Sequence, residues 1–90
     1  MDTRAHVFYS GSVQGVGFRY TVRGLASESN LKGWVKNLRD GRVEMIVEGK
    51  KEAVEELIKQ IDDHFSGYVT NKEIHYEKPS SNLPDFSIAF

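Results

Sequence analysis

The sequence predicts an α+β fold in which two helices pack on one face of an antiparallel sheet. Four segments have the alternation or the β-rich composition of strands, and two have the apolar spacing of amphipathic helices. Asp40-Gly41, a strong hairpin signal, lies between two of the strand segments. In chain order we expect a strand at residues 4–10, a helix at 18–30, strands at 32–38 and 42–49, a helix at 51–65 and a strand at 69–78.

A glycine-rich turn joins the first strand to the first helix. Val7 and Tyr9 fall on one face of the strand because successive side chains of a strand point to opposite sides. The helix carries an apolar stripe made of Phe18, Val22, Leu25 and Ala26. Gly24 lies inside this helix at a cost of about 1 kcal/mol relative to alanine, which a close approach to a neighbouring strand would explain. Asn30 tolerates the left-handed conformation and is expected to end the helix.

The second half of the chain repeats the alternation of strands and helix. The hairpin turn is Arg39-Asp40-Gly41, and the second helix is expected to end before Gly67. Its apolar face consists of Val54, Leu57, Ile58, Ile61 and Phe65.

The last strand of the pattern ends at Pro79, and a loop leads to a short extra strand. In that strand Phe86, Ile88 and Phe90 are expected on one face. The order strand, helix, strand, strand, helix, strand is that of a ferredoxin-like βαββαβ sandwich. We expect residues 1–90 to form a single domain.

Composition excludes several classes of function. The 90 residues carry a net charge of −1 without a basic cluster, which argues against binding to nucleic acid. The absence of cysteine excludes disulfides and thiolate metal sites, and His6, His64 and His75 lack metal-ligand spacing. No apolar run is long enough to span a membrane, and no signal-peptide pattern opens the chain. We therefore expect a small cytoplasmic protein, monomeric and without metal, membrane or nucleic-acid partner.

The segment Gly11–Arg19 has the residue types of an anion-binding site. Three glycines in seven residues permit positive φ, so that successive backbone N–H groups can converge. The helix N-terminus adds unpaired donors, and Arg19 adds a planar cation suited to two oxygens of one oxyanion. Together they predict a phosphate site, although it is neither a P-loop nor a dinucleotide fingerprint, which has Gly at the position of Tyr20. Alternatively, the glycines serve only the turn and Arg19 is a solvated surface residue.

Asn37 is the second candidate. It lies near the end of a strand, directly before the predicted hairpin. From the residues alone it either takes part in a site at that end of the sheet or faces solvent on the open side of the sheet.

Two stretches resemble the signatures of the acylphosphatase family. Ser10–Arg19 (SGSVQGVGFR) is similar to the N-terminal signature, and Gly33–Val43 (GWVKNLRDGRV), followed by Gly49, is similar to the second one. Both stand in the family's order and spacing, and the chain length and the aromatic end Phe86–Phe90 also fit. The chain departs from many members after the second helix, where it reads FSGYV at residues 65–69 instead of a Gly-Pro-rich turn.

The resemblance implies hydrolysis of small acyl phosphates to a carboxylate and inorganic phosphate, without metal, other cofactor or covalent phosphoenzyme. Inorganic phosphate is then the product or an inhibitor. Asn37 would position the attacking water, and the side chains of Phe18 and Trp34 would lie in the core. The implied substrate-binding groups are the backbone amides of Gln14, Gly15, Val16, Gly17 and Phe18 and the guanidinium of Arg19.

Other interpretations belong to other functional classes. A ferredoxin-like module can keep such a loop to bind anions without catalysing a reaction. Acylphosphatase-like domains also begin the large carbamoyl-transferring hydrogenase maturation proteins. An RNA-recognition domain has the same topology, but its aromatic signature is missing from residues 43–48, which read VEMIVE. The presence of both Arg19 and Asn37 favours the enzyme.

Overall fold

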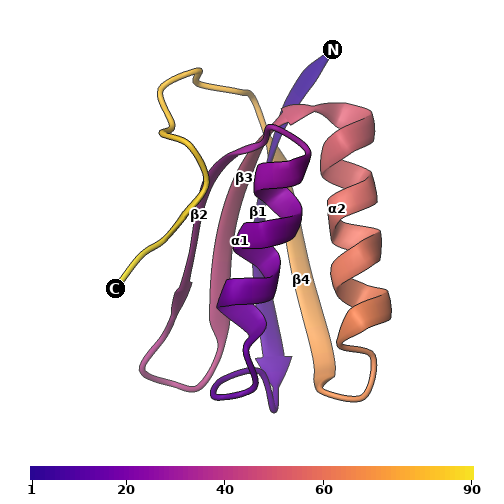
Figure 1. Ribbon diagram of the computed structural model, residues 1–90, viewed down its shortest axis with the longest axis vertical. Coiled ribbons are helices and arrows are strands. Elements are labelled where there is room, and N and C mark those ends of the chain that lie inside the picture. The colour runs from indigo at the N-terminus through magenta and orange to yellow at the C-terminus, as the bar shows by residue number, and fades with distance from the viewer.

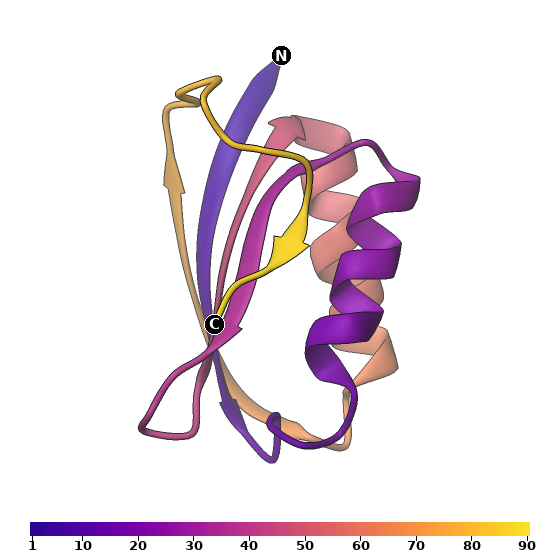
Figure 2. The same cartoon turned by 60° about the vertical axis from the view of Figure 1, so that its left-hand side comes forward.

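Two helices cover one face of a five-stranded sheet in the computed structural model, which describes residues 1–90 (Figure 1 and Figure 2). This confirms the predicted α+β, ferredoxin-like architecture. The elements are β1 (Asp2–Gly11), α1 (Phe18–Glu28), β2 (Lys32–Asn37), β3 (Val43–Lys50), α2 (Lys51–His64), β4 (Val69–Glu77) and β5 (Ser87–Ile88). Each bound of the first six elements lies within two residues of the predicted one. The last strand differs more, because only Ser87 and Ile88 of the expected Phe86–Phe90 pair with a neighbour.

The strand order is β4-β1-β3-β2-β5, with antiparallel pairing among the first four and parallel pairing between β2 and β5. Both β1 and β2 run antiparallel to β3, so they run parallel to each other and end at the same edge of the molecule. The segment that follows β1 and the hairpin that follows β2 therefore meet at one end of the sheet, the lower end in Figure 1.

The core lies between the sheet and the helices. Ala5, Val7 and Tyr9 of β1 are fully buried, as the alternation predicts, and the helices bury Phe18, Val22 and Ala26 from α1 and Val54, Leu57, Ile58 and Ile61 from α2. Eighteen buried residues form one cluster. Burial of this apolar surface holds both helices on the sheet at about 25 cal/mol per Å² removed from water.

Two aromatic residues do not take their expected places. Trp34 is half-buried and outside the core cluster, because its neighbours Gly33 and Val35 face the helices and the alternation turns its side chain to the open face of the sheet. Phe90 is fully exposed beyond the end of β5, whereas Phe86 is buried and Ile88 packs against the core.

The prediction for Asn30 is confirmed, whereas the close approach expected at Gly24 is not found. Asn30 has a φ of 57° and ends α1, as predicted. Gly24 has no close neighbour, because a Cβ built on it would have nothing within 4 Å. The close approach occurs at Gly33 instead, where a Cβ would lie 1.9 Å from the carbonyl oxygen of Ile46.

Two of the three histidines pair with carboxylates. His6 and His75 lie opposite each other on β1 and β4, but His6 Nε2 is 2.6 Å from a carboxylate oxygen of Glu44 and His75 Nε2 is 2.9 Å from one of Glu73. No group of three or more potential ligands is arranged for a metal ion. Neither helix is long and apolar enough to cross a membrane.

Candidate active site

The candidate site lies where β1 and β2 end. Residues 12–17, which we call the glycine loop, connect β1 to α1, and Asn37 is the last residue of β2. A hollow of about 120 Å³ lies between them. It is lined by Val13, Gly15, Gly17, Phe18, Arg19, Tyr20 and Asn37. The structure thus brings together Arg19 and Asn37, which are far apart in the sequence.

The glycine loop turns by placing alternate residues in the left-handed conformation. Gly15 and Gly17 have φ values of 78° and 79°, and Gly17 is the N-cap of α1. A Cβ at either position would meet nothing within 4 Å, so backbone conformation rather than lack of space calls for glycine. Alternation of left-handed and right-handed residues directs successive N–H groups toward one side of the chain.

The backbone N–H groups from Gln14 to Tyr20 donate no hydrogen bond to any acceptor of the protein, and the first bond of α1 is from Thr21 N–H to the carbonyl oxygen of Gly17 at 3.0 Å. Unpaired donors at a helix N-terminus, with the partial positive charge of the helix dipole, are suited to an anion. Gln14 to Phe18, the residues whose amides we expected to hold phosphate, belong to this set.

Core packing and a backbone hydrogen bond help to hold the glycine loop in place. The side chains of Val13 and Phe18 are buried in the core, as expected for Phe18. The N–H of Ser12 donates to the carbonyl oxygen of Tyr68 at 2.9 Å. The turn after α2, where the chain departs from many acylphosphatases, therefore contacts the start of the glycine loop although it is distant in sequence.

Arg19 carries a positive charge that no carboxylate neutralises. The residue is half-buried at the start of α1, and no acidic group lies within 4 Å of its guanidinium. The Phe90 ring lies beside it, with its centroid 5.5 Å from Cζ. The planar guanidinium remains available to donate two parallel hydrogen bonds to an oxyanion.

Asn37 has a buried polar atom without a partner. Its Oδ1 is inaccessible to solvent and receives no hydrogen bond from the protein. An unpaired buried acceptor costs about 1–3 kcal/mol, so such groups are uncommon in folded proteins. Other atoms of Asn37 line the hollow beside the glycine loop.

A tight hairpin turn follows Asn37. The N–H of Leu38 donates to the carbonyl oxygen of Arg42 at 2.8 Å, and that of Gly41 donates to the carbonyl oxygen of Leu38 at 3.2 Å. Gly41 has a φ of 95°, as expected of a three-residue hairpin loop. Asp40 accepts hydrogen bonds from the backbone and side chain of Arg42, which lower the pKa of its carboxyl.

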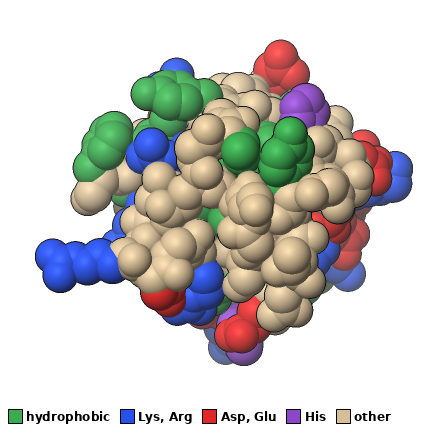
Figure 3. Space-filling view, turned by 90° about the horizontal axis from the view of Figure 1, so that it is seen from below, with side chains coloured by type: hydrophobic (Ala, Val, Ile, Leu, Met, Phe, Trp, Pro, Cys, Tyr) green, Lys and Arg blue, Asp and Glu red, His purple; other side chains and the backbone are tan.

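Figure 3 shows the molecule from this end. The middle of the face consists mainly of backbone and uncharged polar side chains, with hydrophobic side chains among them, and acidic side chains lie toward its margin. No cluster of acidic side chains covers the middle of this face.

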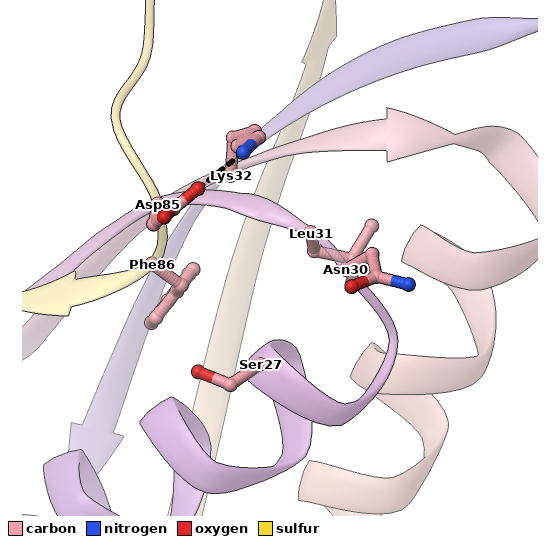
Figure 4. Close-up of a pocket in the computed structure, with 6 residues that line it drawn as sticks. All are labelled: Ser27, Asn30, Leu31, Lys32, Asp85 and Phe86. Atoms are coloured by element: carbon pink, nitrogen blue, oxygen red, sulfur yellow. Dashed lines mark hydrogen bonds and ion pairs between the residues drawn. The ribbon is translucent and has the colours of Figure 1, made fainter.

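A second hollow of about 200 Å³ lies at the opposite end of α1 (Figure 4). It is lined by Ser27, Asn30, Leu31, Lys32, Asp85 and Phe86. The Lys32 ammonium is paired with the Asp85 carboxylate, so the one cation here is already neutralised. The N–H groups of Asn30 and Leu31 in this hollow donate to carbonyl oxygens at the end of α1, unlike the unpaired amides beside the glycine loop.

The sequence analysis missed two groups at the site. Tyr20 lines the hollow with a side chain that is 59% exposed, and its position next to Arg19 on the exposed side of α1 was the available signal. The side chain of Gln14, considered only for its backbone, contacts the hairpin instead of solvent.

Known proteins of the same kind match this chain over nearly its whole length. The family model described as acylphosphatase matches residues 5–88. An acylphosphatase of Chloroflexus aurantiacus is 46% identical over 97% of this chain and 96% of its own length.

Solved structures agree with the sequence comparison. The crystal structure of acylphosphatase from Bacillus subtilis matches with a TM-score of 0.90 and 36% identity, over 98% of this chain and 99% of that one. Full-length HypF, solved in a phosphate- and nucleotide-bound form, matches with a TM-score of 0.84 and 25% identity over all of this chain but only 12% of its own. These likenesses show that the chain belongs to the acylphosphatase family and is a hydrolase of acyl phosphates.

Proposed function

We propose that the chain hydrolyses acyl phosphates by direct in-line attack of water on phosphorus. A water oxygen forms a bond to phosphorus while the bond between phosphorus and the acyl oxygen breaks. The carboxylate leaves with the electron pair of that bond, and inorganic phosphate is the second product. The glycine loop and Arg19 hold the phosphoryl group, and Asn37 positions the water. The observation that carries this proposal is the meeting of unpaired donors, a free guanidinium and an unpartnered amide oxygen around one hollow.

The phosphoryl group binds through the backbone amides of Gln14 to Phe18 and through the Arg19 guanidinium. Support comes from the unpaired state of those amides and from the absence of any acidic residue among those that line the hollow. Each charge-assisted hydrogen bond is stronger than one between neutral groups. The same donors face the charge of the transition state, because they are fixed before the substrate arrives.

Asn37 accepts a hydrogen bond from the attacking water and leaves the water's lone pair directed at phosphorus. The unpartnered Oδ1 supports this role. An amide cannot act as a base at neutral pH, so the water proton passes to a phosphate oxygen or to solvent. A carboxylate is a good leaving group and needs no general acid, which agrees with a hollow lined by no histidine, lysine, aspartate or glutamate. Phosphoryl transfer of this kind depends mainly on positioning and on stabilisation of charge.

The test is the rate of benzoyl phosphate hydrolysis in EDTA, with inhibition by inorganic phosphate as a measure of ground-state binding. Loss of one preorganised donor costs about 10²–10³-fold in rate. We expect Arg19→Ala to lose turnover and phosphate binding together, because its charge contacts both the ground state and the transition state. We expect Asn37→Ala to lower kcat while phosphate inhibition stays nearly unchanged.

Two variants serve as matched controls. Arg23→Ala removes an exposed arginine one helical turn from Arg19, and Asn71→Ala removes an exposed asparagine of β4; both should turn over like the parent protein. Abolished phosphate binding in Asn37→Ala, with turnover of bound substrate preserved, would refute the assignment of roles. A parent protein that binds phosphate but hydrolyses nothing would favour the anion-binding module.

The wider setting follows from the same proposal. We expect phosphate, the product, to inhibit competitively because it occupies the position of the phosphoryl group. The site is assembled within one chain, so the specific activity should be independent of protein concentration. We also expect the protein to elute as a monomer in size-exclusion chromatography. A cytoplasmic location stays a prediction, which fractionation of the source cells would test.

A further inference from the structure

We propose that the side chain of Gln14 is a positioning residue that sets the distance between the glycine loop and Asn37. This inference rests on the proposed function, because it concerns the alignment of bound phosphoryl group and attacking water. Gln14 has been considered so far only as one of the backbone donors.

The side chain of Gln14 bridges two parts of the site. Its Nε2 donates to the carbonyl oxygen of Leu38 at 2.7 Å and to that of Arg42 at 3.0 Å. Both partners are acceptors, so only the NH₂ end of the amide can face them, and both of its protons are used. The residue is half-buried, which shields these bonds from competing water.

The two acceptors belong to the turn that directly follows Asn37. The same carbonyl groups accept the backbone hydrogen bonds that close the hairpin, from Gly41 to Leu38 and from Leu38 to Arg42. Gln14 therefore contacts a turn that is already rigid, and Asn37 is the residue before it. No other hydrogen bond of the structure joins the glycine loop to this hairpin.

The sheet supplies only part of this connection. Val43 of β3 is the register partner of both Tyr9 and Asn37, so strand pairing fixes Asn37 relative to the end of β1. The glycine loop itself has no strand pairing, so without the Gln14 contacts its position relative to Asn37 is less restrained. Phosphate binding needs only the glycine loop and Arg19. In-line attack also needs Asn37 at the right distance from the bound phosphoryl group.

The experiment compares Gln14→Met, which keeps the length of the side chain and removes both donors, with Gln60→Met on the distant helix α2. Benzoyl phosphate turnover, phosphate inhibition and thermal unfolding are measured for both. A misplacement of about 1 Å can lower a rate about 10²-fold, so we expect kcat to fall about 10-fold or more in Gln14→Met. Phosphate inhibition should change by less than about 3-fold, because the donors that hold the anion remain. Gln60→Met should match the parent protein.

A second step tests whether Gln14 acts through Asn37. In an Asn37→Ala background the Gln14→Met substitution should cause little further loss of kcat, since the water is already unpositioned. Equal losses in both backgrounds would overturn the inference, as would a lower melting temperature with kcat unchanged. If Gln14→Met does not fold, Gln14→Glu, which has the same size and lacks donors toward the carbonyls, is measured in its place. Failure of both variants to fold would show that the contact serves stability alone and would overturn the inference. An inactive parent protein would refute the proposed function and this inference with it, whereas an active parent with an active Gln14→Met refutes only the inference.

Discussion

Glycine-to-alanine substitutions at three positions should change stability in opposite directions. Gly15, Gly17 and Gly24 all have open space where a Cβ would be added. Gly15 and Gly17 have positive φ, whereas Gly24 lies within helix α1 and has none. Steric contact is thus equal at the three positions, and backbone conformation alone decides the effect.

The expected magnitudes follow from the cost of each conformation. A left-handed residue with a Cβ costs roughly 1–2 kcal/mol, so Gly15→Ala and Gly17→Ala should lower the free energy of unfolding by about that amount. Alanine within a helix is favoured over glycine by about 0.8–1.0 kcal/mol, so Gly24→Ala should raise it. For a domain of this size 1 kcal/mol corresponds to a shift in Tm of roughly 4–8 °C.

The loop substitutions should also weaken phosphate binding. A residue that leaves the left-handed region turns its neighbouring N–H groups away from the common point, so the inhibition constant for phosphate should rise in Gly15→Ala and Gly17→Ala. Gly24→Ala should retain the parent's inhibition constant. Thermal unfolding and phosphate inhibition of benzoyl phosphate hydrolysis measure both effects. A Gly17→Ala protein with unchanged Tm and unchanged phosphate inhibition would refute the conformational argument.

Two further predictions concern buried polar groups. Burial alone would raise the pKa of the Glu48 carboxyl, but hydrogen bonds from the backbone of Ser80 and Ser81 and from Arg4 lower it overall. The ionised carboxylate therefore contributes its full stabilisation above the unfolded-state pKa of about 4.5, and this stabilisation is lost as the pH falls through the lower folded-state pKa. Urea unfolding between pH 7 and pH 3 should therefore show a smaller acid loss in Glu48→Gln, and an equal loss would contradict the prediction. Asn37→Ala should leave the free energy of unfolding unchanged or higher, because it removes an unpaired buried oxygen; a fall of more than about 1 kcal/mol in the same assay would mean that the oxygen is satisfied.

The fold could be predicted from the sequence because the buried apolar residues recur at the spacing typical of a strand or of a helix. Alternate burial of Ala5, Val7 and Tyr9 and the helical spacing of Val22 and Ala26 are local signals. The meeting of the glycine loop with Asn37 follows from the predicted topology, because β1 and β2 both run antiparallel to β3 and therefore finish at the same end of the sheet.

Other features depend on contacts that no local pattern records. The side chain of Gln14 donates to two carbonyl groups of a hairpin more than twenty residues away. Every residue has a backbone carbonyl, so nothing in the sequence marks these two as the partners. The contact of Tyr68 with Ser12 is likewise made by backbone atoms. Phe90 continues the apolar alternation of Phe86 and Ile88 but passes beyond the last strand pairing, so periodicity alone placed it wrongly.

The unpaired groups at the site do not all call for the same ligand. Backbone N–H groups and a free guanidinium are sufficient for an anion-binding module, and they would be found in such a module without any chemistry. The buried Oδ1 of Asn37 is different, because an acceptor beside a bound phosphate gains nothing from the anion and is repelled by its oxygens. A proton donor would compensate for its burial, and the proposed hydrolysis brings one, water, to this part of the site. The amide oxygen of Asn37, more than the loop, therefore favours hydrolysis over anion binding alone.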